Sequence, residues 1–125
     1  MMKTRKKMKV IIAGSRHMAH DMSLLSCAIA RAGWEITEVV CGLAKGADTW
    51  GKYWAQYYNI PVKEFPADWE KYGKAAGVLR NKQMADYADT AIVFIWDNSR
   101  GSKNMIDTMQ KLGKPVYIVN NGVIT

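Results

Sequence analysis

The chain has 125 residues, of which 49% are hydrophobic and 10% aromatic. This length and composition exclude two domains and extensive disorder, and they predict one globular domain with a real core. The formal net charge is +7, but five of the 18 basic side chains lie within the first nine residues, so the rest of the chain carries only +2. We therefore expect residues 1–8 to form a basic arm and residues 9–125 to form the domain. Nucleic acid is an open partner for the arm, but the near-neutral body does not favour it.

The first apolar run, Val10 to Ala13, is too short for a signal peptide or a membrane span, which predicts a cytoplasmic protein without membrane contact. Cys27 and Cys41 lack metal-ligand spacing, and the carboxylates are not clustered. We expect both cysteines to be reduced packing residues, and we expect no metal and no cofactor.

Apolar runs alternate with segments of helical spacing. The runs predict strands, the third of them near an edge because of its prolines, at residues 9–14, 36–41, 60–66, 90–96 and 116–119. Three- and four-residue spacing predicts helices at residues 21–32, 50–58, 77–87 and 101–112. Gly33 and Gly113 are the expected helix terminators. Residues 67–76 are expected to be mostly loop, and those after Val119 a polar tail.

The second of these helices carries several aromatic side chains. Trp50, Trp54 and either Tyr57 or Tyr58 share one face at helical spacing, so we expect them in the core rather than in a stacking platform.

This alternation is typical of the α/β class. It predicts a single Rossmann-like three-layer domain, in which a five-stranded, mainly parallel sheet carries helices on both faces. In such sheets ligands bind outside the carboxyl ends of the strands, where the strand order reverses. Four polar turns are expected at that edge: Gly14 to Arg16, Gly42 to Asp48, Asp68-Trp69, and Asn98 to Ser102.

The turn from Gly42 to Asp48 connects a strand to a helix. Such a turn points backbone N–H groups and the positive end of a helix dipole at one spot, which suits a phosphate. Arg16 is expected to clamp the phosphate, whereas Lys45 fits a surface role equally well. Asp48 fits a helix cap or a ribose contact. Together with the other turns, this one predicts a nucleotide-phosphate site.

The segment from Arg80 to Met84, followed by Ala88 to Val93 and Ser99 to Ser102, resembles the SLOG superfamily. That superfamily includes the LOG nucleotide phosphoribohydrolases and the Smf/DprA single-strand DNA-binding proteins. The resemblance is strongest to short bacterial and phage SLOG proteins, which carry Ala-Gly-Ser-Arg, Gly-x-Ala-x-Gly-Ala-Asp, Phe-Pro-Ala-Asp-Trp and Gly-x-x-Arg-Asn-x-x-Met. The corresponding segments here are Ala13 to Arg16, Gly42 to Asp48, Phe65 to Trp69, and Gly77 to Met84.

The resemblance implies that Arg80 matches the LOG active-site arginine, which makes it the candidate catalytic residue. Met105 stands where LOG enzymes have a glutamate, and Asn81 replaces the neighbouring lysine. Methionine cannot stabilise an oxocarbenium-like transition state, so LOG-type hydrolysis would need a carboxylate from Asp48, Asp68 or Asp97. The expected ligand-binding residues are Gly14, Ser15, Arg16, Gly42, Lys45, Gly46, Ala47, Asp48, Asp68, Trp69, Arg80, Asn81, Ser99, Arg100, Gly101 and Ser102.

Three functions remain open. The favoured one is a sensor, carrier or sequestering module for a nucleoside phosphate or an ADP-ribose-like ligand. The alternatives are a phosphoribohydrolase or related N-glycosidase, and a Smf/DprA-like binder of single-stranded nucleic acid. The resemblance to LOG proteins also implies a homodimer or a higher homo-oligomer.

Overall fold

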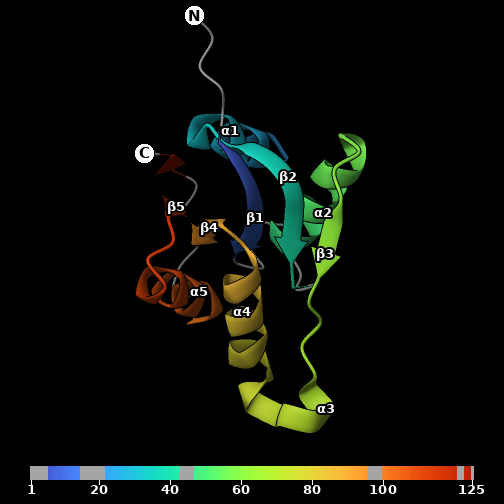
Figure 1. Cartoon of the computed structure of the whole chain (residues 1–125), viewed down its shortest axis with the longest axis vertical. Coiled ribbons are helices and arrows are strands. Elements are labelled where there is room, and N and C mark those ends of the chain that lie inside the picture. The colour runs from blue at the N-terminus through green and yellow to red at the C-terminus, as the bar shows by residue number, and fades with distance from the viewer. Residues whose placement is uncertain (1–5, 15–21, 43–46, 96–99, 121–122, 125) are drawn as a thin grey trace, which may run out of the picture.

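The computed structural model describes residues 6–14, 22–42, 47–95, 100–120 and 123–124 (Figure 1). Strands and helices alternate through most of this range. In chain order the elements are β1 (Lys7–Gly14), α1 (Met22–Ala32), β2 (Glu35–Cys41), α2 (Ala47–Tyr57), β3 (Val62–Glu64), α3 (Trp69–Tyr72), the 3-10 helix η2 (Gly73–Ala75), α4 (Ala76–Tyr87), β4 (Thr90–Ile95), α5 (Arg100–Lys111), β5 (Val116–Asn120) and β6 (Val123–Ile124).

The described strands form one sheet in the order β3-β2-β1-β4-β5-β6. The strands from β1 to β5 pair in parallel, and β3 lies at an edge as its prolines predict. β6 adds an antiparallel edge strand, with Val119 opposite Ile124, so the prediction that these residues only form a polar tail missed this strand. The sheet confirms the predicted Rossmann-like α/β fold.

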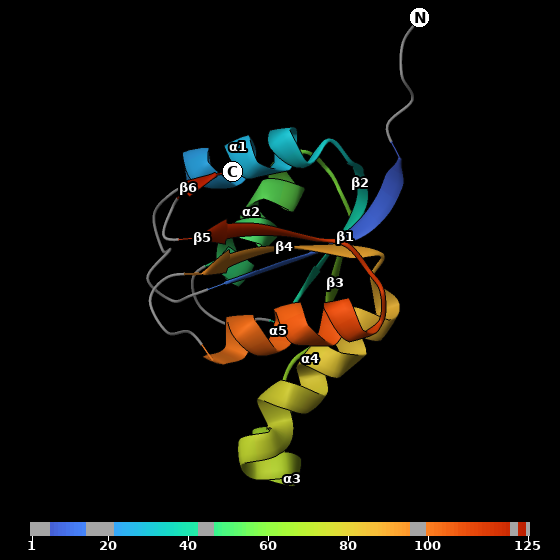
Figure 2. The ribbon, with the colours of Figure 1, turned by 90° about the vertical axis from the view of Figure 1, so that its left-hand side faces the viewer.

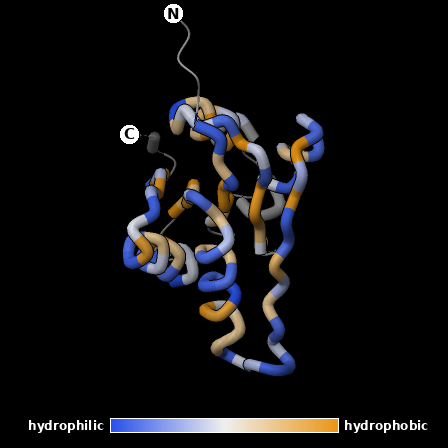
Figure 3. The backbone as a smooth tube through the Cα atoms, in the orientation of Figure 1, coloured by the Kyte–Doolittle hydropathy of each residue, from blue (hydrophilic) through white to orange (hydrophobic). Residues whose placement is uncertain are grey.

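The sheet is covered on both faces, as predicted (Figure 2). Alternate side chains of a strand point to opposite faces, so Ile12 packs with α1 and α2 whereas Ile11 packs with α4 and α5. Because both faces are covered, the central strands read as continuous apolar runs. They form the hydrophobic centre of the molecule in Figure 3.

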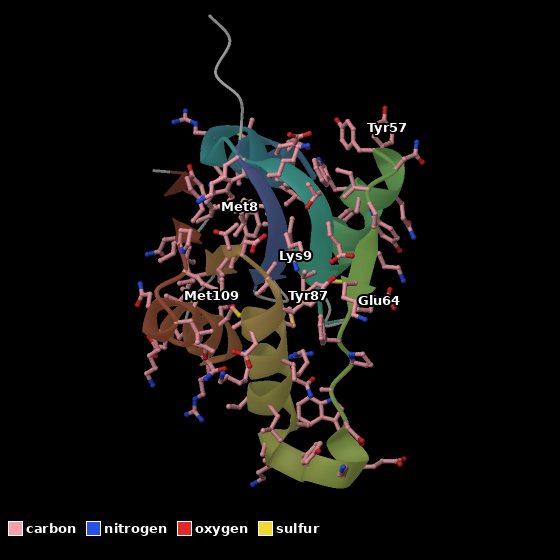
Figure 4. All side chains as sticks on the ribbon, in the orientation of Figure 1. Met8, Lys9, Tyr57, Glu64, Tyr87 and Met109 are labelled. Atoms are coloured by element: carbon pink, nitrogen blue, oxygen red, sulfur yellow. The ribbon has the colours of Figure 1, made fainter. Side chains whose placement is uncertain are left out.

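Helix α2 approaches the sheet closely because Gly51 faces it. A Cβ atom at Gly51 would lie 2.8 Å from Cβ of Ile12, so any larger residue would push the helix away. Trp54 is buried and Trp50 partly buried, as expected, but Tyr57 and Tyr58 are exposed, and Tyr57 retains 79% of its accessible surface (Figure 4). The expectation of a core tyrosine here is wrong, because α2 turns Gly51, Trp54 and Ala55 inward and ends at Tyr57.

The cysteines differ in their surroundings. Cys41 is buried at the end of β2, but Cys27 is exposed. The prediction that Cys27 is a packing residue is wrong, because α1 buries Leu25 and Ala28 and leaves Cys27 on its outer face.

Residues 69–79 form an arm that projects past the end of β3, on the side of the sheet covered by α4 and α5, with α3 at its tip (Figures 1 and 2). The expectation of mostly loop for residues 67–76 is wrong. Asp68 starts α3 by accepting a hydrogen bond from the backbone N–H of Lys71 at 3.0 Å. Neither α3 nor η2 buries a side chain, so the apolar periodicity that reveals a helix in sequence is missing here.

The start of the domain includes part of the basic run. β1 begins at Lys7, and Met8 is buried in the core on the α1 and α2 side of the sheet. The ammonium group of Lys9 lies 4.3 Å from the ring centroid of Tyr87 (Figure 4). In the described parts of the chain, every helix is too short or too polar to cross a lipid bilayer.

Candidate functional site

The carboxyl ends of three neighbouring strands bring the predicted turns together. Gly14 ends β1 and is paired with Phe94 of β4, Gly42 directly follows β2, and α5 begins at Arg100 beyond β4. The chain proceeds from β1 to β2 on one side and places β4 on the other, so the strand order reverses between β1 and β4. This is the position at which open α/β sheets bind ligands.

Arg80 reaches this edge from the second turn of α4. Its Nη1 donates a hydrogen bond to the carbonyl oxygen of Gly42 at 2.8 Å. Its Nε donates to Oδ1 of Asn81 at 3.3 Å. These two bonds hold a half-buried guanidinium group at the exit of β2.

Gly42 makes this approach of Arg80 possible. A Cβ atom at position 42 would lie 2.7 Å from Cδ, 2.8 Å from Nη1 and 2.9 Å from Nε of Arg80. Real Cβ contacts do not come so close, so the bond of Arg80 to the exit of β2 requires glycine at this position.

Asn81 connects the same segment to α5. Its side chain is only 7% exposed, and Nδ2 donates to the carbonyl oxygen of Gly101 at 3.2 Å and to Oδ1 of Asn104 at 2.9 Å. The two consecutive residues Arg80 and Asn81 therefore join the exit of β2 to the first turn of α5.

The first turn of α5 contains three more of the predicted residues. Ser102 is buried, whereas Arg100 and Gly101 are exposed. A Cβ atom at Gly101 would meet no described atom within 4 Å, so packing within the described structure does not require glycine there. Met105, one turn further, is fully buried in the core between the sheet and α4 and α5.

Asp68 and Trp69 lie elsewhere, at the beginning of the arm. Asp68 caps α3, and Trp69 is 60% exposed, with its ring 3.5 Å from a Cβ atom built at Gly77. Figure 1 shows α3 beyond the end of α4 that is remote from the sheet. The structure thus does not bring this pair into contact with Arg80 or Gly42.

Several predicted residues lie outside the described range. They are Ser15, Arg16, Lys45, Gly46 and Ser99, together with Asp97, one of the alternative carboxylates. Ala47 and Asp48 are the first two residues of α2.

Sequence reasoning missed the contribution of Asn104. Its side-chain oxygen accepts a bond from Asn81, and its backbone carbonyl accepts from Thr108 Oγ1 at 2.7 Å. Spacing along α5 gives no signal for the first contact, because its partner is 23 residues away in sequence.

The other end of α4 carries a separate polar cluster. The hydroxyl of Tyr87 donates a hydrogen bond to Oε1 of Glu38, and this bond, with some loss of solvent, raises the pKa of Tyr87 above its ordinary value. Within the described ranges, no three His, Cys, Asp or Glu side chains gather in a way that could hold a metal ion.

Comparisons with known proteins agree with the fold. A sequence model of YAcAr, described as the YspA, cpYpsA-related SLOG family, matches residues 8–72. The chain is also similar to the Gene 61 protein of Mycobacterium phage D29. The two are 36% identical over 118 residues, which covers 86% of this chain and 93% of the phage protein. No solved structure matches significantly.

Proposed function

Because the chain belongs to the YspA, cpYpsA-related SLOG family, we propose that it binds a nucleotide or nucleotide-derived ligand at the carboxyl edge of its sheet. The ligand class is a nucleoside phosphate or an ADP-ribose-like molecule. The protein then acts as a sensor, carrier or sequestering module for it.

The position of Arg80 is the observation that supports this proposal. A guanidinium group has five N–H donors, and the bonds to Gly42 and Asn81 use two of them. The others suit the oxygen atoms of a phosphate, for which arginine is well matched in shape and charge. The first turn of α5, with exposed Gly101 and buried Ser102, adds backbone N–H donors at the positive end of a helix dipole.

The hydrolase alternative is less well supported. The residue at the LOG glutamate position, Met105, is part of the hydrophobic core and has no acid–base chemistry. Of the alternative carboxylates, Asp68 caps α3 on the arm. The described hydrogen bonds of Arg80 are to Gly42 and Asn81, so they bring no carboxylate beside it that could assist cleavage of an N-glycosidic bond.

The expected homo-oligomer also remains a proposal, and the arm is its candidate contact surface. Four large apolar side chains are exposed there, and the lower part of α4 is strongly hydrophobic in Figure 3. They are Trp69, Tyr72, Val78 and Leu79. Light scattering after size exclusion should give the mass of a dimer for the wild type and of a monomer for a Val78→Glu, Leu79→Glu double variant. Gln83→Glu, on an exposed position of the same helix, is the control.

Thermal unfolding in the presence of ligands tests the central proposal. We expect ADP-ribose or AMP at millimolar concentration to raise the Tm of the wild type, because a ligand that binds only the native state stabilises it. Arg80→Ala should lose this shift, whereas Gln83→Ala, with an exposed side chain on the same helix, should keep it. If neither ligand nor any related nucleoside phosphate shifts the wild type, the proposal is wrong.

The same samples separate the alternatives. Chromatography after incubation with AMP or ADP-ribose would show free adenine only if the protein is an N-glycosidase. Fluorescence anisotropy with a single-stranded oligonucleotide, compared between the wild type and a variant lacking residues 1–5, tests the nucleic-acid alternative. Affinity that falls with salt and with this deletion would favour it.

A further inference from the structure

Asn81 stands out among the buried residues. In the described part of the chain, the buried polar or charged side chains are Asn81, Thr90 and Ser102. Thr90 has a local structural role, since its hydroxyl donates to the carbonyl oxygen of Pro115 at 2.6 Å. Asn81, in contrast, has three partners on two helices: Arg80 on its own helix α4, and Gly101 and Asn104 on α5.

The chemistry of these partners fixes the orientation of the Asn81 amide. The carbonyl of Gly101 can only accept a hydrogen bond, so the NH₂ group must face it. The Nε–H of Arg80 can only donate, so Oδ1 must face that group. Both amide hydrogens are engaged, one by Gly101 and one by Oδ1 of Asn104. If the amide were reversed, its NH₂ group would face the Nε–H donor of Arg80 and its oxygen would face the carbonyl oxygen of Gly101.

This arrangement holds the guanidinium group at two of its nitrogen atoms. Oδ1 of Asn81 accepts a hydrogen bond from Nε, and the carbonyl oxygen of Gly42 accepts one from Nη1 at 2.8 Å. Two bonds to neighbouring nitrogens of a planar group restrict both its position and its rotation. The loss of side-chain freedom is thus completed before any ligand arrives, which reduces the entropy lost on binding.

We propose that Asn81 is a positioning residue, which sets the Arg80 guanidinium at a fixed place relative to the first turn of α5 through its bonds to Arg80, Gly101 and Asn104. This role rests on the proposed function, because the Arg80 guanidinium and the first turn of α5 are the two groups proposed to bind the anion. Asn81 itself does not contact the ligand: its amide hydrogens are used within the protein. An anion that binds between Arg80 and the first turn of α5 then meets hydrogen-bond donors whose separation is already fixed by the protein.

Three variants separate the bond of Asn81 to Arg80 from its bonds to Gly101 and Asn104. Asn81→Leu removes the acceptor for Arg80 and the donors to α5 while keeping the branched shape and the number of side-chain heavy atoms. Asn81→Asp keeps an acceptor for Arg80 but loses the N–H donors to Gly101 and Asn104. Asn104→Ala removes only one bond to α5 and is the matched control. Each variant is prepared as the full chain, and dispersed amide resonances show that it is folded.

Nuclear magnetic resonance of the arginine Nε–H groups and backbone amides provides a readout without ligand. In Asn81→Leu we expect faster exchange of the Arg80 Nε–H and shifted amides at both Gly42 and Gly101. In Asn81→Asp the Arg80 signal should remain protected while the Gly101 and Ser102 amides shift. In Asn104→Ala the shifts should stay within α5. A folded Asn81→Leu protein with unchanged Arg80 and Gly42 signals would overturn the proposal.

Binding of ADP-ribose, followed by calorimetry, provides the second readout. We expect Asn81→Leu to weaken binding about tenfold or more, since a hydrogen bond to a charged group is lost at the anion donor, and Asn81→Asp to weaken it less. Equal affinity of the wild type and Asn81→Leu would also overturn the positioning role. If the wild type binds neither ADP-ribose, nor AMP, nor any related nucleoside phosphate, the proposed function is wrong, while the resonance data still decide whether Asn81 positions Arg80.

Discussion

Nη1 of Arg80 donates a 2.8 Å hydrogen bond to the carbonyl oxygen of Gly42, 38 residues earlier in the chain. The bond joins the second turn of α4 to the exit of β2, and it exists only because position 42 has no side chain. Two residues from different motifs of the sequence thus form one structural unit, and substitutions at either one should have related effects.

Gly42→Ala should weaken ligand binding without a large loss of stability. The added Cβ atom would lie within 2.9 Å of three atoms of the Arg80 side chain, which is half-buried and able to move away. The bond to the Gly42 carbonyl is then lost. We expect at least a severalfold weaker affinity for ADP-ribose by calorimetry, with a change in unfolding free energy of about 1 kcal/mol or less. Unchanged affinity in the alanine variant would contradict the role of this contact.

Two glycine substitutions in helices should have opposite effects on stability. Gly51→Ala places a methyl group 2.8 Å from Cβ of Ile12, so α2 must move, at a cost of about 1–3 kcal/mol. Gly77→Ala in α4 meets only Trp69, at an ordinary contact distance of 3.5 Å. Its better helix propensity should stabilise the protein by about 0.5–1 kcal/mol. Urea unfolding measures both, and a destabilised Gly77→Ala variant would be inconsistent with the structure of the arm.

Introducing the LOG-type glutamate should not restore hydrolysis. Met105 is buried among Met84, Ile106 and Met109, so Met105→Glu would place a carboxyl group in the hydrophobic core. We expect a loss of at least about 3 kcal/mol of stability and no release of base from AMP. Met105→Leu is the control, and its stability should change by less than about 1.5 kcal/mol. A stable glutamate variant that cleaves AMP would show that this position faces the site.

Lys114 caps the carboxyl end of α4. Its Nζ donates to the carbonyl oxygens of Ala85, Asp86 and Ala88, at 2.7, 3.1 and 2.8 Å. A cation at this end of a helix also interacts favourably with the helix dipole. Lys114→Met should therefore destabilise the protein by about 1 kcal/mol in urea unfolding. Lys111→Met removes a cation from the exposed last turn of α5, where only the dipole interaction is lost, so it should destabilise the protein less; equal effects would argue against the cap.

The hydrogen bond between Tyr87 and Glu38 predicts that the phenol of Tyr87 ionises at a higher pH than an ordinary tyrosine. The bond favours the neutral hydroxyl, so the pKa of Tyr87 is raised in the folded protein. Because the folded pKa lies above the unfolded one, this stabilising contribution is complete below pH 10 and is lost as the pH rises through the folded pKa. Absorbance titration of tyrosinate should show one phenol that ionises above pH 10 in the wild type. Tyr87→Phe should lack that step, and its persistence in the variant would assign it to another tyrosine.

The sequence by itself determined the fold class and predicted the edge of the sheet at which the proposed site lies. Runs such as Thr90 to Ile95 are apolar without alternation because both faces of a parallel strand are covered, and this information is local. The helix ends at Gly33 and Gly113 could also be predicted, because a left-handed residue at a helix end favours glycine. In the structure these two glycines have φ of +75° and +70°.

Only the tertiary structure decided which side chains meet. The expectation of mostly loop for residues 67–76 was wrong because neither α3 nor η2 buries a side chain. The expectation that Tyr57 or Tyr58 lies in the core was wrong because Gly51 sets the inward face of α2. Likewise, a list of polar turns cannot show that Asn81 turns inward to α5 while Arg80, its neighbour, reaches Gly42. These contacts depend on how α4 lies across the strand ends, and that placement is set by long-range packing rather than by the pattern of any one segment.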